Sequence, residues 1–85
     1  MDKFNEGIYL ELLEILQNLH PDVDFTINKE LVDAGILDSF DIVTLVSDIA
    51  DIFDVTISAD EIIPENFNSA SALAELIKIK LEDEE

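Results

Sequence analysis

The segment Asp33-Ala34-Gly35-Ile36-Leu37-Asp38-Ser39-Phe40-Asp41 contains the start of the helix that decides the fold. A glycine precedes two apolar residues, and Asp38 then stands where a helix N-cap belongs. Asp41 follows three residues later, near the positive end of the helix dipole. Apolar residues recur at helical spacing from there, so we predict a helix over residues 39–53 with Ser39 as its first residue. The predicted buried stripe consists of Ile42, Leu45, Val46, Ile49 and Phe53.

Three further helices are predicted on either side of this one. The first covers residues 4–19 and ends at His20-Pro21, because proline restricts the preceding residue and has no backbone N–H. A short helix is expected over residues 59–63, ended near Pro64, and Asn68 or Ser69 is expected to cap a last helix. The apolar stripes are Phe4, Ile8, Leu12, Ile15, Leu16 and Leu19 in the first helix, and Ala70, Leu73, Ala74, Ile77 and Leu81 in the last.

The pattern therefore predicts an all-α four-helix bundle with three long helices and one short helix. A long loop over residues 20–37 joins the first two helices. Because structureless loops of this length are rare in compact domains, we expect its own apolar residues to pin it, with one helical turn near residues 29–32. The length of 85 residues favours a single domain over residues 1–85.

The charge is strongly negative, with 21 acidic residues, four basic ones and a net charge of −17. Such a surface repels nucleic acid and anionic lipid and attracts basic patches on other proteins. Cysteine is absent, which excludes a thiol nucleophile and fits the cytoplasm. Residues 1–6 do not resemble a signal peptide, and no apolar run approaches the roughly 20 residues that cross a bilayer. We therefore expect a cytoplasmic monomer without membrane insertion.

Neither a catalytic residue nor a metal site is predicted. His20 is the single histidine, and in its place before a proline it is typical of a helix end. No histidine or lysine lies near Ser39 in the sequence, although the serine of a hydrolase needs a base. No glycine-rich phosphate loop is present. Asp22-Val23-Asp24 resembles the start of a calcium loop, but Ile27 stands where that loop needs glycine.

Ser39 is the residue that the sequence most strongly indicates as a site of covalent modification. Its hydroxyl is expected to be exposed at the rim of the bundle, where a phosphodiester would lie beside free N–H groups at the helix start. The ordinary alternative is a serine that satisfies those N–H groups itself. On the outward face, an exposed Phe40 beside polar groups suggests a docking surface, unless it folds back on the loop. That face carries Phe40, Asp41, Thr44, Ser47, Asp48 and Asp51.

Residues 35–40, Gly-Ile-Leu-Asp-Ser-Phe, resemble the attachment motif of acyl and peptidyl carrier proteins, in which Asp-Ser-Leu opens the second helix. Phe40 stands here in place of the commoner leucine. The resemblance extends over nearly the whole chain, including the order and lengths of the helices. The stretch Gly-Ile-Leu-Asp-Ser and the stretch Pro-Glu-Asn-Phe at residues 64–67 are more similar to D-alanyl and other stand-alone aminoacyl carriers than to fatty-acid carriers.

The resemblance implies that a phosphopantetheinyl transferase moves 4'-phosphopantetheine from coenzyme A to Ser39 Oγ, with Asp38 as the flanking residue of the motif. The terminal thiol of that arm would carry an acyl or aminoacyl group as a thioester. The same resemblance implies basic partner enzymes, which load or use the cargo. Together with the outward face of the helix, it leads us to expect that partners bind at Phe40, Asp41, Thr44, Asp48 and Asp51.

The sequence departs from the pattern of fatty-acid carriers at two positions. By position, Asp38, Asp41 and Asp51 match acids that carriers use toward partners, but Thr44 and Ala50 stand where many fatty-acid carriers have glutamate. This departure puts the set of partners in doubt. The alternative function is a helical adaptor that uses the same acidic face without a prosthetic group.

Overall fold

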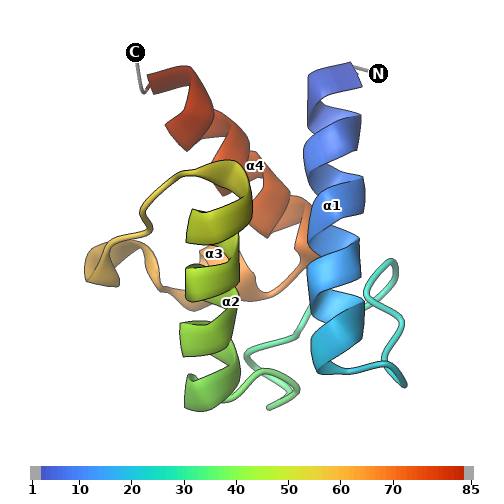
Figure 1. Cartoon of the computed structure of the whole chain (residues 1–85). Coiled ribbons are helices and arrows are strands. Elements are labelled where there is room, and N and C mark those ends of the chain that lie inside the picture. The colour runs from blue at the N-terminus through green and yellow to red at the C-terminus, as the bar shows by residue number, and fades with distance from the viewer. Residues whose placement is uncertain (1–2, 84–85) are drawn as a thin grey trace.

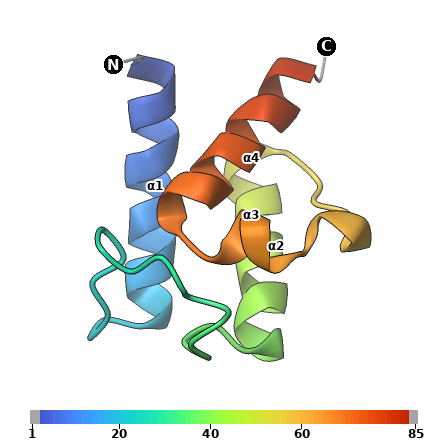
Figure 2. The same cartoon turned by 180° about the vertical axis from the view of Figure 1, so that it is seen from behind.

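A computed structural model of the chain describes residues 3–83 and confirms an all-α bundle (Figure 1). α1 and α2 stand side by side, and α4 crosses behind them. The first turn of α1 and the last turn of α4 lie at one end of the bundle, and α2 begins at the other (Figures 1 and 2). The elements in chain order are α1 (Lys3–Leu19), α2 (Ser39–Phe53), the 3-10 turn η1 (Ala59–Glu61), α3 (Pro64–Phe67) and α4 (Ala70–Asp83).

The bounds of α2 agree with the prediction because both of its ends carry clear local signals. At the start, the Asp41 N–H donates to Asp38 Oδ1 over 2.9 Å, and the Asp38 N–H donates to Asp41 Oδ2 over 3.3 Å. This reciprocal pair is a capping box. At the end, Asp54 adopts the left-handed conformation with φ of 58°, and its N–H still bonds to the Ala50 carbonyl over 3.0 Å. An αL residue of this kind is a common helix stop.

The core is apolar throughout, and among the residues whose burial is described no polar or charged side chain is buried. Three of its members, Phe25, Leu31 and Leu37, come from the long loop, which confirms that the loop is pinned by its own apolar residues. The side chain of Phe4 lies outside the described part. The buried set consists of Ile8, Leu12, Ile15, Leu16, Phe25, Leu31, Leu37, Leu45, Ile49, Val55, Ile57, Phe67, Ala70, Leu73, Ala74 and Ile77.

Three predicted core positions of α2 are less buried than their place in the stripe suggested. Leu45 and Ile49 are fully buried, whereas Ile42, Val46 and Phe53 are only half-buried against the core. At about 100° per residue, Ile42, Phe53 and Val46 lie roughly 20°, 40° and 60° to one side of Ile49, and Leu45 lies roughly 40° to the other. The side of the stripe nearer to Leu45 is therefore the one that faces the core. The fully buried aromatic residues are Phe25 and Phe67 instead.

The short helix predicted over residues 59–63 is wrong in its placement. The structure has the 3-10 turn η1 at Ala59–Glu61, and the four-residue α3 begins at Pro64 instead of ending there. Proline suits the first position of a helix, where its missing N–H would have no partner in any case. Pro64 is therefore a start signal for α3 and not the stop signal expected from the sequence.

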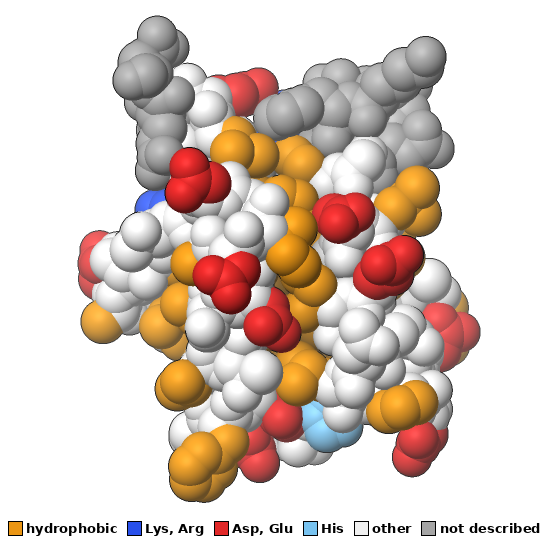
Figure 3. Space-filling model, in the orientation of Figure 1, with side chains coloured by type: hydrophobic (Ala, Val, Ile, Leu, Met, Phe, Trp, Pro, Cys, Tyr) orange, Lys and Arg blue, Asp and Glu red, His pale blue; other side chains and the backbone are white. Residues whose placement is uncertain are grey.

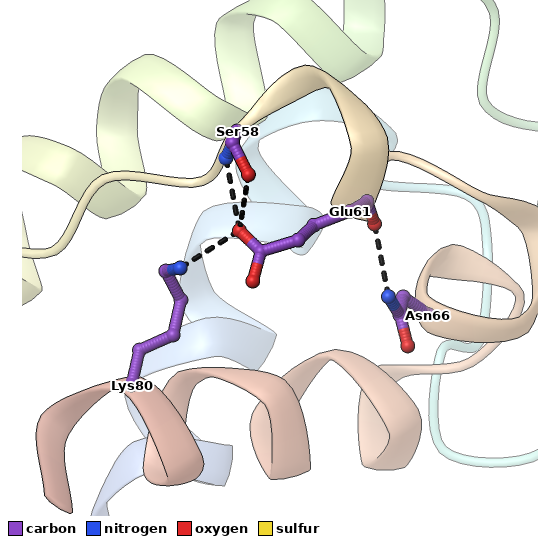
Figure 4. A network of polar contacts seen from close by, with 4 residues as sticks. All are labelled: Ser58, Glu61, Asn66 and Lys80. Carbon is purple, nitrogen blue, oxygen red and sulfur yellow. Dashed lines mark hydrogen bonds and ion pairs between the residues drawn. The ribbon is translucent and has the colours of Figure 1, made fainter. Parts of the chain in front are cut away.

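Glu61 connects η1 to α4 through a small polar network (Figure 4). Its Oε1 accepts hydrogen bonds from the N–H and the hydroxyl of Ser58, each over 2.9 Å, and lies 2.7 Å from Lys80 Nζ. The Asn66 side chain donates to the Glu61 carbonyl over 2.9 Å. The ion pair with Lys80, helped by the Ser58 bonds, lowers the pKa of Glu61 to about 2.

The cap of α4 is Ser69, one of the two residues predicted for it. Its hydroxyl accepts a hydrogen bond from the Ala72 N–H over 3.0 Å. The predicted turn in the long loop is present as a single turn, closed by the bond from the Ala34 N–H to the Glu30 carbonyl over 2.7 Å. Within residues 3–83, no helix is both long enough and apolar enough to cross a membrane.

Candidate functional site

The loop that leads into α2 is anchored in the core at Leu37. Gly35 has a φ of 77°, a conformation that a residue with a side chain adopts only under strain. The turn at this glycine lets Leu37 enter the core, where it is 3% exposed. The Leu37 N–H donates to the Leu31 carbonyl over 2.9 Å. Asp38 and Ser39 therefore follow a fixed point of the backbone.

Ser39 is exposed, and its hydroxyl has no hydrogen-bond partner within residues 3–83. The cap of α2 comes from Asp38, which leaves the serine oxygen free. In the same part of the chain, the N–H groups of Ser39 and Phe40 have no acceptor. A hydroxyl beside two open N–H donors at the positive end of a helix suits a phosphodiester, whose oxygens accept such bonds. The residues present therefore fit a phosphate-linked arm.

Asp41 belongs to this site in a way that the sequence did not reveal. His20 Nε2, from the residue after α1, lies 2.7 Å from Asp41 Oδ2. The hydrogen bond with His20 lowers the pKa of Asp41, and the Asp38 N–H acts in the same direction. No sequence signal pairs two residues that are 21 positions apart. The contact joins the end of α1 to the start of α2, so the first turn of α2 is fixed from both sides.

The outward face of α2 beside Ser39 is more apolar than predicted. Phe40 is 83% exposed, so it does not fold back on the loop. Val43, within the same helix, is 67% exposed. Val43 was not predicted as part of this exposed face. It is an apolar residue outside the predicted buried stripe, and this position alone could have indicated that it is exposed.

The acidic residues predicted to bind partners differ in how accessible they are. Asp51 and Thr44 are exposed, and Asp48 is half-buried. Asp41 is turned toward His20, and its side chain is only 21% exposed, so its carboxylate is not displayed as openly as predicted. Figure 3 shows acidic side chains over both α1 and α2 on this face, on either side of an apolar strip between the two helices.

Comparison with known proteins identifies the family of this chain. The family model described as "Phosphopantetheine attachment site" matches residues 8–77. Aminoacyl carrier protein 1 of Bradyrhizobium diazoefficiens is 31% identical over 86 aligned positions, which cover 96% of this chain and 94% of the relative. D-alanyl carrier proteins of Streptococcus sanguinis and Streptococcus mutans are 32% and 33% identical, covering 80% and 76% of this chain and 87% and 84% of their own.

The fold and these matches define a class of protein, a small helical carrier with a covalent arm. The chain belongs to the phosphopantetheine attachment family. It is a carrier that holds an acyl or aminoacyl group on a 4'-phosphopantetheine arm, and the family itself is not catalytic. The arm supplies the thiol that this cysteine-free chain lacks.

Proposed function

We propose that Ser39 carries the phosphopantetheine arm and that the cargo is an amino acid, presented as a thioester to basic partner enzymes. The observation that supports Ser39 is its free, exposed hydroxyl at the first position of α2, with the cap supplied by its neighbour Asp38. The protein acts as a shuttle, since the chemistry of loading and transfer belongs to its partners.

The other serines are less suited to carry the arm. The hydroxyls of Ser58 and Ser69 are engaged in hydrogen bonds with Glu61 and with the start of α4. Ser47 is exposed but lies in the middle of α2, away from open N–H groups. Ser71 is exposed near the start of α4 and is the strongest competitor.

The attachment site is tested by intact-mass measurement. The purified chain is incubated with coenzyme A and a phosphopantetheinyl transferase of broad specificity. We expect a gain of one phosphopantetheine in the wild type, in Ser47→Ala and in Ser71→Ala, and no gain in Ser39→Ala. A mass gain that persists in Ser39→Ala would reject the assignment.

The aminoacyl cargo is supported by the names of the relatives, which are an aminoacyl carrier and two D-alanyl carriers. To test it, the arm-bearing protein is incubated with ATP, a panel of amino acids and amino-acid-activating enzymes. In parallel, it is charged with fatty acids by an acyl-activating enzyme. We expect hydroxylamine-sensitive mass gains from amino acids. Loading by fatty acids alone would refute the aminoacyl assignment and leave the arm on Ser39 intact.

The docking surface for these partners is the exposed side of α2 next to Ser39. Phe40 and Val43 offer apolar contact there, and Thr44, Asp48 and Asp51 offer polar and negatively charged groups. With a net charge of −17, the carrier favours partners with basic patches, because opposite charges speed encounter. Asp41 contributes negative charge to this surface, although its carboxylate is engaged with His20.

A further inference from the structure

Asn68 fastens the long loop to the other side of the bundle. It lies directly after α3, yet its backbone carbonyl and its side chain are directed at the loop, 35 to 37 positions away in sequence. Its backbone carbonyl accepts the Leu31 N–H over 2.9 Å. Its side-chain oxygen accepts the N–H groups of Val32 over 2.9 Å and Asp33 over 3.0 Å. Its side-chain nitrogen donates to Asp33 Oδ2 over 3.1 Å.

This cluster of bonds continues toward Ser39. Leu31, which Asn68 holds, is 1% exposed, and its carbonyl accepts the Leu37 N–H over 2.9 Å. Leu37 is followed by Asp38 and Ser39. A short path of contacts thus runs from the junction of α3 and α4 to the first residue of α2. The cap of α4 is Ser69, so Asn68 is not needed at that helix start.

We propose that Asn68 is a positioning residue for arm transfer, which holds residues 31–37 in the conformation that presents Ser39 to the transferase. The proposal rests on the assignment of Ser39 as the attachment residue. A loop that samples several conformations presents the correct one for only a fraction of the time, and the apparent affinity of the transferase falls by that fraction. Loosening the loop should therefore raise KM and leave kcat nearly unchanged.

Three variants test the hydrogen bonds between the Asn68 side chain and the loop. Asn68→Ala removes all three side-chain bonds to the loop. Asn68→Asp keeps the two acceptor bonds to the loop N–H groups but loses the donor and sets a second carboxylate against Asp33. Adding Asp33→Asn to Asn68→Asp restores a donor and acceptor pair of the same size, with the two groups exchanged.

The experiment measures steady-state arm transfer from coenzyme A at a temperature where circular dichroism shows every variant folded. We expect KM to rise about five- to tenfold in Asn68→Ala, with kcat within about twofold of wild type. Asn68→Asp should also raise KM, and the exchanged pair should return KM to near the wild-type value. Amide hydrogen exchange on the protein without its arm should show faster exchange at Leu31, Val32 and Asp33 in Asn68→Ala.

A matched control is Ile77→Val, a truncation of a fully buried side chain in α4 that weakens the fold but removes no hydrogen bond to the loop. Its KM should equal that of wild type while it remains folded. A folded Asn68→Ala with wild-type KM would overturn the proposal. So would an exchanged pair as impaired as Asn68→Asp alone. Neither result bears on Ser39, whose own test is the mass gain lost in Ser39→Ala.

Discussion

At the level of single residues, Asp38 and Ser39 share two tasks at the start of α2. Asp38 closes the capping box with Asp41, and the Ser39 hydroxyl is left without an internal bond. Serine is itself a good N-cap residue, but here Asp38 occupies the N-cap position. Asp38 therefore caps the helix, and Ser39 does not. Adding a group to Ser39 Oγ therefore removes no hydrogen bond on which the helix depends.

This division predicts unequal stability effects for two neighbouring substitutions. Asp38→Ala should lower the free energy of unfolding by about 1 kcal/mol, because the N-cap is lost. Ser39→Ala should change it by less than about 0.5 kcal/mol. Urea unfolding followed by circular dichroism measures both, with Asp38→Asn as a control that keeps a capping side chain. Equal losses in the two alanine variants would show that Ser39 takes part in the cap.

Glu61 predicts a pH dependence of stability at acidic pH. Its pKa is lowered from an ordinary 4.5 to about 2, so the folded state binds its proton less tightly than the unfolded state does. The stabilisation is therefore complete above about pH 5 and is lost as pH falls from about 4.5 toward 2. Unfolding curves of wild type and Glu61→Gln should differ at pH 6 and converge toward pH 2. In a Lys80→Met background the difference between the protein with Glu61 and its Glu61→Gln variant should shrink, because the largest cause of the lowered pKa is gone. A stability difference between wild type and Glu61→Gln that stays constant from pH 6 to pH 2 would contradict this explanation.

At the level of elements, the exposed face of α2 makes a prediction about partner docking. Asp48→Lys with Asp51→Lys should slow arm transfer to Ser39 mainly through association, and the defect should diminish at high salt. Phe40→Ala should weaken docking at every ionic strength, because an apolar contact is not screened. Asp41 is left unchanged because it belongs to the capping box.

The control for this docking experiment is Glu11→Lys with Glu75→Lys, which changes the net charge equally at exposed positions of α1 and α4. Transfer rates of both double variants, measured from low to high salt, decide between a local surface and a general charge effect. Equal slowing in the two double variants would mean that net charge alone matters and that α2 has no special role.

The burial of two phenylalanines predicts how much each contributes to the stability of the fold. Phe67, from the four-residue α3, is 1% exposed, so Phe67→Ala should cost about 3 to 5 kcal/mol. That loss approaches the whole stability of a small domain, and Phe67→Leu provides a milder variant if Phe67→Ala does not fold. Phe53→Ala should cost clearly less, since Phe53 is half-buried. Urea unfolding of the set gives the order, and a larger loss for Phe53→Ala would place the core nearer to the end of α2.

These elements also show how far the sequence could predict the fold and the site. Long helices with a strong apolar stripe and a cap, above all α2, could be predicted nearly to the residue. α3 could not, because four residues carry no periodicity and Pro64 is compatible with either end of a helix. The position of Ser39 followed from the register of α2. The contacts of Asp41 with His20 and of Asn68 with the loop could not be predicted, since they join residues far apart in sequence and depend on packing.

At the level of the whole molecule, the net charge of −17 lies within extents of only 35 × 28 × 21 Å. At an ionic strength of 0.01 M the Debye length is about 30 Å, so charges across the entire bundle repel one another, whereas at 1 M it is about 3 Å. The melting temperature should therefore rise as sodium chloride is added from low ionic strength. A melting temperature that does not respond to salt would show that self-repulsion contributes little to the stability of this fold.

The bundle also has two distinct ends. The first turn of α1 and the last turn of α4 lie together at one end, and α2 with Ser39 begins at the opposite one (Figures 1 and 2). A tether at either terminus, whether a flexible linker, an affinity tag or a solid support, would therefore leave the serine facing away from its anchor. The carrier could be immobilised by its ends on a bead or a sensor surface, with its modification site open to enzymes in solution.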